Sequence, residues 1–274
     1  MPTILVPTDF SKCANNALMY ALEIAERTSR SITVLYVVYP YEGVDNNMYD
    51  AFFVDTYVNE RIESMKKWVK KFTKSPQFSA VPVHIECRIG FPVSTIIHTA
   101  EDIHAGLIAM GTTGASGLKG VLLGSIAAGV VSGSKVPVFV IPPKAVFRNH
   151  ARFAFATDFK IPVSQTALAM MRELLNIQHT GLNIVHVLGS GEKKPESRAE
   201  HALSERLGTI PHNFHYLHDD KVVSAIHHFL ESTDCNGLVA VAHERTLIQK
   251  LFIKSVTRSL AHQTSVPMLI LHDA

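Results

Sequence analysis

The stretch Gly111–Ser125, GTTGASGLKGVLLGS, is the part of the sequence around which the rest is organised. It directly follows Gly106–Met110, a short apolar run typical of a buried strand. Gly111 and Gly114 come at the carboxyl end of that strand, where a side chain would keep a ligand away from the backbone. The first part of the stretch therefore predicts a turn that a ligand can approach closely.

The second part of the stretch begins a helix. Gly124 and Ser125 precede the apolar pattern Ile126–Val131. The first N–H groups and the dipole of such a helix attract anions, and Ser125 can cap the helix or donate its hydroxyl to a phosphate. The spacing Gly-x2-Gly-x9-Gly-Ser is neither GxxxxGK[ST] nor GxGxxG. It predicts a phosphate cradle, and a glycine-rich turn without a ligand is the alternative.

The amino-terminal segment predicts a βαβ unit. Thr3–Val6 is an apolar run that stops at Pro7, Thr8 and Asp9, and Ser11 can cap the helix that follows. Apolar residues then recur at helical spacing: Ala14, Ala17, Leu18, Ala21, Leu22 and Ala25. Ile32–Val38 reads as a second buried strand, and such units cross over right-handed.

The same alternation continues through the first half. Expected helices cover Tyr49–Phe72 and Val93–Ile103, and expected strands cover Val81–Ile89, Leu107–Met110 and Val136–Ile141. Strands that alternate with helices predict an open parallel sheet covered on both faces, with a Rossmann-like, doubly wound topology. Asp9, Val37 and Gly111 all fall at carboxyl ends of strands, where such sheets bind ligands.

An internal repeat accounts for the length of 274 residues. Phe153–Phe159 restates Ile4–Phe10 at an offset of 149, and Val266–Leu271 restates Val136–Ile141 at an offset of 130. Leu182–Leu188 corresponds to Ile32–Val38 in the repeat, and Gly237–Val241 corresponds to Gly106–Met110. The prediction is two tandem five-stranded domains, residues 1–148 and 149–274, joined near Lys144–Ala151.

The second copy departs from the first at the cradle. Ala242 and Arg245 stand in place of Gly111 and Gly114, and Lys254 stands in place of Gly124. Side chains at these positions close the backbone to a ligand. We expect this copy to be degenerate, although Arg245 and Lys254 could instead bind a phosphate through their side chains.

Composition limits the class of protein. The formal net charge is +2 and hydrophobic residues make up 47% of the chain, so we expect neither a nucleic-acid nor a membrane-surface binder. Cys13, Cys87 and Cys235 are isolated and predict reduced packing residues. The sequence opens on a strand rather than on a basic leader with a long apolar run, and we expect a cytoplasmic protein.

Three further patterns have simple interpretations. Lysines between Lys66 and Lys74 fit the solvated end of a helix better than an anion site. Gly189-Ser190-Gly191 lacks the third glycine of a dinucleotide fingerprint and reads as a plain turn. Histidines crowd the second half, but His215 would face away from His212 and His218 on a strand, so we expect no convergent metal site.

The segment ILVPTDFS at residues 4–11, together with the Gly-x2-Gly-x9-Gly-Ser spacing, resembles the ATP-binding branch of the universal stress protein family. The resemblance implies that Asp9 and the backbone of Val37 meet the adenosine end, and that Gly124, Ser125 and Ile126 hold the outer phosphates. The complete candidate set is Pro7, Thr8, Asp9, Val37, Met110, Gly111, Thr112, Gly114, Gly124, Ser125 and Ile126.

The expected function is an ATP-binding regulatory module in stress response, with ATP bound alone or with Mg²⁺. A slow ATP hydrolase or other nucleotide-using enzyme is one alternative, although the loop offers only Lys119 as a cation and no histidine or carboxylate. A ligand-independent interaction scaffold is the other. Family dimers pair their fifth strands, so Val136–Ile141 and Val266–Leu271 are expected to pair antiparallel within one chain. Further homodimerisation is left open.

Overall fold

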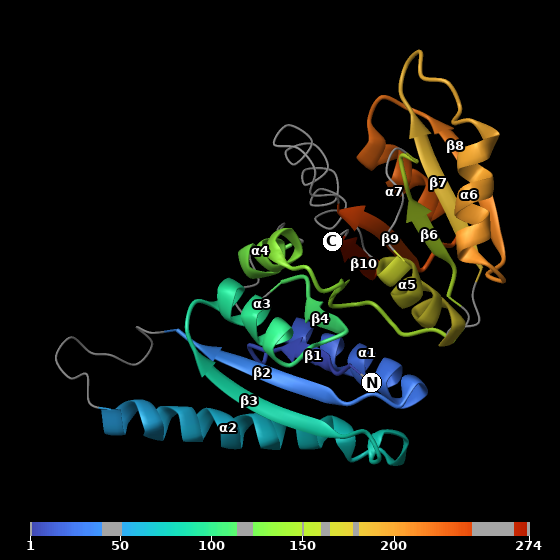
Figure 1. The fold of residues 1–274 in the computed structure, drawn as a ribbon. Helices are drawn as coiled ribbons and strands as arrows, with labels where there is room; N and C mark the ends of the chain where they lie inside the picture. Colours follow the sequence, from blue (N-terminus) through green and yellow to red (C-terminus); the bar gives the residue numbers. More distant parts are fainter. Residues whose placement is uncertain are drawn as a thin grey trace.

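A computed structural model of the chain describes residues 2–39, 51–113, 123–149, 151–159, 165–177, 181–242 and 266–272. It has an α/β fold with a mostly parallel sheet, as predicted (Figure 1). In the first half the elements are β1 (Ile4–Pro7), α1 (Lys12–Thr28), β2 (Ile32–Val38), α2 (Ala51–Thr73), a 3₁₀ turn (Pro76–Phe78), β3 (Val83–Ile89), α3 (Pro92–Asp102), β4 (Leu107–Gly111), α4 (Ser125–Gly133) and β5 (Val138–Ile141).

The second half repeats this order. Its elements are β6 (Phe153–Ala156), α5 (Gln165–Ile177), β7 (Leu182–Leu188), α6 (Ser197–Leu207), β8 (His212–His218), α7 (Val222–Ser232), β9 (Gly237–Ala242) and β10 (Met268–His272). The strands form one ten-stranded sheet in the order β3-β2-β1-β4-β5-β10-β9-β6-β7-β8. Each half thus contributes the same five-strand arrangement, and the division at residues 148 and 149 stays a prediction.

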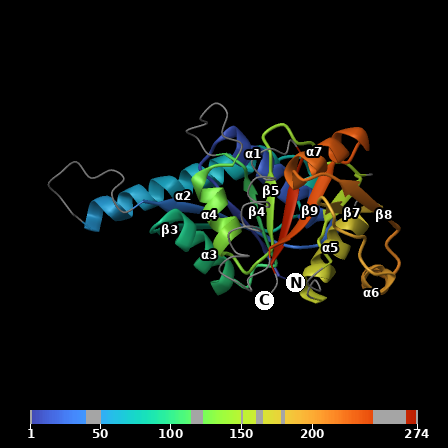
Figure 2. The same ribbon diagram turned by 90° about the horizontal axis from the view of Figure 1, so that it is seen from above.

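The two halves meet where β5 and β10 run side by side (Figure 2). This pair is antiparallel, with Phe139 opposite Leu269, and every other neighbouring pair in the sheet is parallel. The predicted pairing of the two closing strands is confirmed. Phe139 and Leu269 are also equivalent in the repeat, so a pseudo-two-fold axis passes through this pair.

The strand registers correct one detail of the repeat. Ile4 lies beside Leu107 in the first half, and its counterpart Phe153 lies beside Gly237 in the second. The offset between β4 and β9 is therefore 130, whereas the sequence match of Gly106 with Gly237 implied 131. Consequently the structural counterpart of Gly111 is Val241, and not Ala242. A strand's hydrogen-bonding register determines this match, and short apolar runs align almost equally well one residue apart.

Helix α1 illustrates how the sequence forms its elements. The Ser11 side chain accepts a hydrogen bond from the Ala14 N–H at 3.1 Å, which caps the helix as predicted. Each of the apolar positions picked out by their spacing is buried in the structure. The helix ends at Ser29, which adopts a left-handed φ of 52°. One face of the helix therefore packs on the sheet along its whole length.

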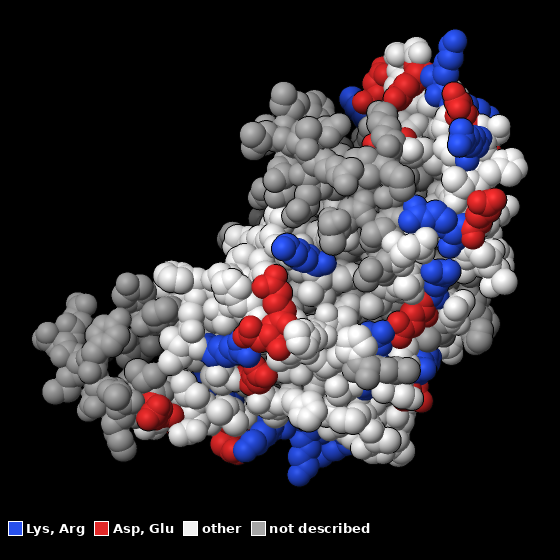
Figure 3. All heavy atoms as spheres, in the orientation of Figure 1, with Lys and Arg blue, Asp and Glu red and all other residues white. Residues whose placement is uncertain are grey.

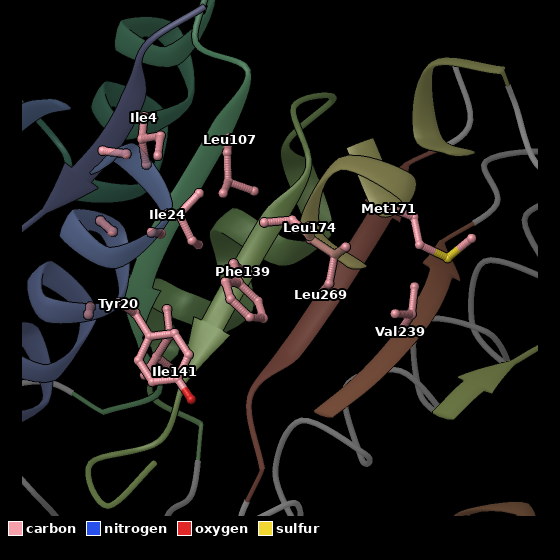
Figure 4. Close-up of a cluster of buried hydrophobic side chains, with 14 of the residues drawn as sticks. Ile4, Tyr20, Ile24, Leu107, Phe139, Ile141, Met171, Leu174, Val239 and Leu269 are labelled. Carbon is pink, nitrogen blue, oxygen red and sulfur yellow. The ribbon is translucent and has the colours of Figure 1, made fainter. Parts of the chain in front are cut away.

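The core forms two layers, one on each face of the sheet. Helices α1, α2, α5 and α6 contribute to the first layer, and α3, α4 and α7 contribute to the second. The first layer continues across the seam between the halves, where Phe139 and Leu269 lie near Met171 and Leu174 of α5 (Figure 4). Because one apolar layer spans both halves, separating them would expose buried surface.

Polar contacts also cross the seam. The Arg30 guanidinium donates to both carboxylate oxygens of Glu173, at 3.0 and 2.6 Å, and the Arg30 side chain is only 8% exposed. Gly106 leaves room for this arginine, because a Cβ there would lie 2.7 Å from the Arg30 Nη1. On the face seen in Figure 3, charges of both signs are interspersed. Among the described residues, no helix is long and apolar enough to cross a membrane.

Candidate functional site

A crevice of about 270 Å³ opens at the carboxyl ends of β1, β2 and β4, between α3 and α4. This is the position at which open parallel sheets place their ligands. The crevice is lined by Pro7, Thr8, Asp9, Ser11, Ala14, Leu35, Tyr36, Val37, Tyr39, Pro92, Ile96, Met110, Gly111, Thr112, Thr113, Gly124, Ser125, Ile126 and Ala127. Every candidate residue from the sequence lies in this lining except Gly114, which is outside the described residues.

The turn after β1 holds Asp9 at the mouth of the crevice. The Thr8 N–H donates to the Leu35 carbonyl at 2.9 Å, and the Thr8 hydroxyl accepts from the Phe10 N–H at 3.0 Å. The Asp9 Oδ1 accepts from the Ser11 N–H at 3.0 Å, so the carboxylate also supports the start of α1. Phe10 adopts a left-handed φ of 62° and stacks on Tyr36 with ring centroids 5.2 Å apart. These contacts fix the position of Asp9 before any ligand arrives.

The backbone of Val37 faces the crevice for a simple geometric reason. Leu35 accepts a bond from Thr8 at the end of β1, while Val38 accepts one from Gly90 beyond β3. Alternate residues of a central parallel strand direct their backbone groups to opposite sides. Val37 therefore turns its N–H and C=O toward the β1 side, past the point where β1 has ended.

Gly111 has a packing role in addition to the one expected. A Cβ at this position would lie 2.7 Å from the Cys13 Sγ and 3.0 Å from the Cys13 carbonyl carbon. The missing side chain thus lets α1 pack closely against β4 beneath the crevice, and the expectation that it only clears space for a ligand was incomplete. Thr112 is fixed beside it, since its N–H donates to the Ile141 carbonyl at 3.2 Å and its hydroxyl lies 3.7 Å from the Cys13 Sγ.

Helix α4 points its amino terminus into the crevice. Its N-cap is Gly124, and no side chain forms the cap hydrogen bond, so the predicted capping role of Ser125 is wrong. Ser125 is instead the first helical residue. The Gly124 N–H donates to the Thr112 carbonyl at 2.7 Å, which ties the helix start to the end of β4. The N–H groups of the next residues remain directed at the crevice, as a phosphate site requires.

The inner wall of the crevice is apolar. Leu35 and Met110 come from the sheet, Ile96 from α3 and Ala127 from α4, and all are buried. Sequence reasoning missed Pro92 and Ile96, because helical spacing does not say which helix covers the end of which strand. Asp9 is the only carboxylate among the described lining residues, which include no lysine, arginine or histidine.

The matching region of the second half keeps the turn and changes its surroundings. The Thr157 hydroxyl accepts from the Phe159 N–H at 3.2 Å, and Phe159 has a φ of 58°. His186 takes the place of Tyr36, and its Nδ1–H donates to the Thr157 carbonyl at 2.8 Å. Arg245 and Lys254 lie outside the described residues, so their expected roles are not tested.

The segment Gly189-Ser190-Gly191, which resembles the start of a dinucleotide fingerprint, is a plain turn in the structure, with φ of 81° at Gly191. Two of its N–H groups already have acceptors within the chain. Gly189 donates to the Glu192 carboxylate at 3.0 Å, and Ser190 donates to Asp220 at 2.8 Å. The bonds from Ser190 hold the pKa of Asp220 below its usual value. These amides are therefore occupied by carboxylates rather than presented to a phosphate.

His212 and His215 make contacts within the second half. His212 contacts the Ser204 hydroxyl at 2.8 Å and the Ile210 carbonyl at 2.7 Å. His215 points elsewhere, with its Nε2 at 3.0 Å from the Asn183 Oδ1. Within the described ranges, no group of three or more metal-binding side chains converges.

Comparison with known proteins identifies the family. Residues 1–142, more than half of the chain, match the universal stress protein family, and the chain belongs to it. A universal stress protein of Methanocaldococcus jannaschii is 34% identical over 140 residues, which cover 50% of this chain and 80% of that protein. A second one from the same organism is 27% identical over 153 residues, 52% of this chain and 94% of the relative.

A solved structure extends the likeness to the second half. The crystal structure of a universal stress protein from Archaeoglobus fulgidus aligns with a TM-score of 0.75 and 24% identity, and covers 99% of this chain and 96% of that one. At this identity the match concerns the fold alone. The two-half architecture is thus shared along nearly the whole chain.

Proposed function

We propose that the first half binds an adenine nucleotide, ATP in particular, and that the protein acts as a regulatory module in stress response. The observation that supports the proposal is that the candidate residues converge on one crevice. Segments more than 100 residues apart in sequence bring Asp9, Val37, Gly111 and Gly124 around one crevice. This arrangement combines a strand-end backbone, a carboxylate and a helix amino terminus, which are groups suited to the three parts of a nucleotide.

The crevice offers a place for each part of the ligand. The apolar wall of Leu35, Ile96 and Met110 suits the flat face of adenine, and the Val37 backbone can donate to and accept from its edge. Asp9 is positioned to accept from hydroxyl or amino groups of the nucleoside. The amino terminus of α4 faces the phosphates, and Mg²⁺ would accompany ATP as their counter-ion.

Binding is favoured over catalysis as the main activity. Phosphoryl transfer needs a group that orients the nucleophile and cations that neutralise the γ-phosphate. The described lining supplies Asp9 alone among these groups, and Asp9 already accepts from the Ser11 N–H. Slow hydrolysis and a ligand-independent scaffold are the competing functions, and the same experiment separates all three.

The test begins with the purified full-length protein. Denaturing it and separating the supernatant by chromatography identifies any nucleotide retained through purification. Titration of nucleotide-free protein with ATP, followed by calorimetry, should then saturate near one ATP per chain, because the second half lacks the cradle. Incubation with Mg²⁺ and ATP measures turnover. Failure to bind any adenine nucleotide would leave the scaffold function, and rapid turnover would replace the binding function with an enzymatic one.

A further inference from the structure

Helix α4 connects the crevice to the second half of the chain. Its first turn carries Gly124 and Ser125, which line the crevice. At its other end, the carbonyl oxygen of Val131 lies 2.8 Å from the Nε2 of His272. A carbonyl can only accept a hydrogen bond, so the imidazole nitrogen is the donor. His272 is the last residue of β10 and therefore belongs to the opposite half.

The acceptor is one that the helix cannot satisfy by itself. Val131 lies in the last turn of α4, which ends at Gly133. The last four carbonyls of an α-helix have no N–H partner within the helix. One of the others is bonded locally, since the Ser134 N–H donates to the Val130 carbonyl at 2.9 Å. For Val131 the donor comes from 141 residues away in the sequence.

The position in the first half that corresponds to His272 carries no donor. The pseudo-two-fold axis through Phe139 and Leu269 relates His272 to Pro142, at the offset of 130. A proline has neither a polar side chain nor a backbone N–H to donate. Pro142 of the first half therefore cannot donate the equivalent hydrogen bond to the second half.

A second restraint holds the flank of α4 against α3. A Cβ at Gly129 would lie 2.7 Å from a methyl group of Val93, so the two helices are in close contact there. With its flank packed and its carboxyl end bonded to His272, this nine-residue helix has little freedom to tilt. A rigid helix about 13 Å long transmits a displacement of its last turn to its first turn.

We propose that His272 is a positioning residue through which the second half holds α4 in place and so strengthens phosphate binding in the first half. The inference rests on the proposed nucleotide-binding function and assigns a role to the half whose sequence lacks the cradle glycines. The second half is a built-in partner that completes the site of the first.

The test compares two substitutions in the full-length chain. His272→Leu removes the donor and keeps a side chain of similar bulk, whereas His272→Gln keeps an N–H donor at similar reach. Loss of a single hydrogen bond should weaken ATP binding about fivefold in the leucine variant, measured by calorimetry. The glutamine variant should stay within about twofold of the original affinity. If the leucine variant is insoluble, His272→Asn replaces it, because its amide is too short to reach Val131.

Glu173→Gln is the matched control. It removes the carboxylate charge and one of the two oxygens that accept from Arg30 across the same seam, and it does not involve α4. This variant should unfold at a lower temperature and bind ATP with unchanged affinity. Equal affinities of the original protein and His272→Leu would overturn the proposal. So would an equal loss in Glu173→Gln, which would mean that any weakening of the seam has the same effect.

Hydrogen exchange separates this inference from the proposed function. Without nucleotide, the amides of α4 should exchange faster in His272→Leu than in His272→Gln, since the helix is less firmly held. If the original protein binds no ATP, the proposed function fails, and this measurement still decides whether His272 positions the helix. Unchanged exchange in α4 would show that it does not.

Discussion

The turn that follows β1 and the turn that follows β6 are near copies, and in the part of the chain that the structure describes the first of them lines the crevice at the carboxyl ends of β1, β2 and β4. Both contain Thr-Asp-Phe, and both place the phenylalanine in the left-handed region, at φ of 62° for Phe10 and 58° for Phe159. In each turn a threonine hydroxyl accepts from the N–H two residues later. These bonds are internal to the turn, so the turn can persist whether or not a ligand binds there.

The surroundings of the two turns have diverged. Tyr36 is replaced by His186, and Gly111 by Val241. In the loop after β7, backbone N–H groups donate to the carboxylates of Glu192 and Asp220. The comparison teaches that the scaffold and the ligand site are separable. Strand-end turns depend on local hydrogen bonds, while a phosphate cradle also depends on backbone amides that a ligand can approach, which these turns do not need.

The largest effect is expected from separating the two halves. Pro137 and Ile141 direct their carbonyls toward β4, so Val140 between them faces β10 and donates to it. Val140→Pro should therefore lower the free energy of unfolding by about 3 kcal/mol or more and expose the 144–151 segment to proteolysis. Val140→Ala is the control, because it keeps the N–H. Similar unfolding of the two variants would mean that packing alone joins the halves.

A second prediction copies the second half into the first at β4. Gly111→Val would place a side chain against Cys13 of α1, and overpacking of this kind destabilises by about 2–3 kcal/mol. ATP affinity should fall as well, since α1 and β4 would move apart beneath the crevice. Adding Cys13→Ala should restore part of the stability, as judged by thermal unfolding. No recovery at all would show that the backbone of Cys13 causes the clash.

A third prediction contrasts the paired aspartates. Asp9→Asn should weaken ATP binding about tenfold, because a charged acceptor is replaced by a neutral amide. Asp158→Asn, at the equivalent turn, should leave ATP affinity unchanged. Calorimetry on both variants provides the comparison. A similar loss in Asp158→Asn would show that the second half also binds the nucleotide.

The smallest effect concerns pH in the second half. Burial lowers the pKa of His215, whose ring lies 4.9 Å from that of Phe229. The folded state therefore favours the neutral ring. This stability is fully present above the ordinary histidine pKa of about 6.5, and it is lost as the pH falls through the lowered value. On acidification, the temperature of thermal unfolding should fall more in the original protein than in His215→Gln. Parallel curves would contradict this.

Some features of the site follow directly from residue order. The crevice lies at the carboxyl ends of β1, β2 and β4, close to Asp9, Val37 and Gly111, and parallel topology brings those ends together whatever the side chains between them. The pairing of the closing strands was predictable for a similar reason. Apolar edge strands need a partner, and the other half is always nearby.

The sequence by itself determined the alternation of strands and helices, the internal repeat and the place of the crevice, because each depends on short-range periodicity or on backbone chemistry. Only the tertiary structure decided that Gly111 makes room for Cys13, that Ile96 of α3 forms part of the wall, and that His272 bonds to α4. These contacts join residues far apart in the chain. Spacing along a sequence carries no record of which side chains meet when separate elements pack.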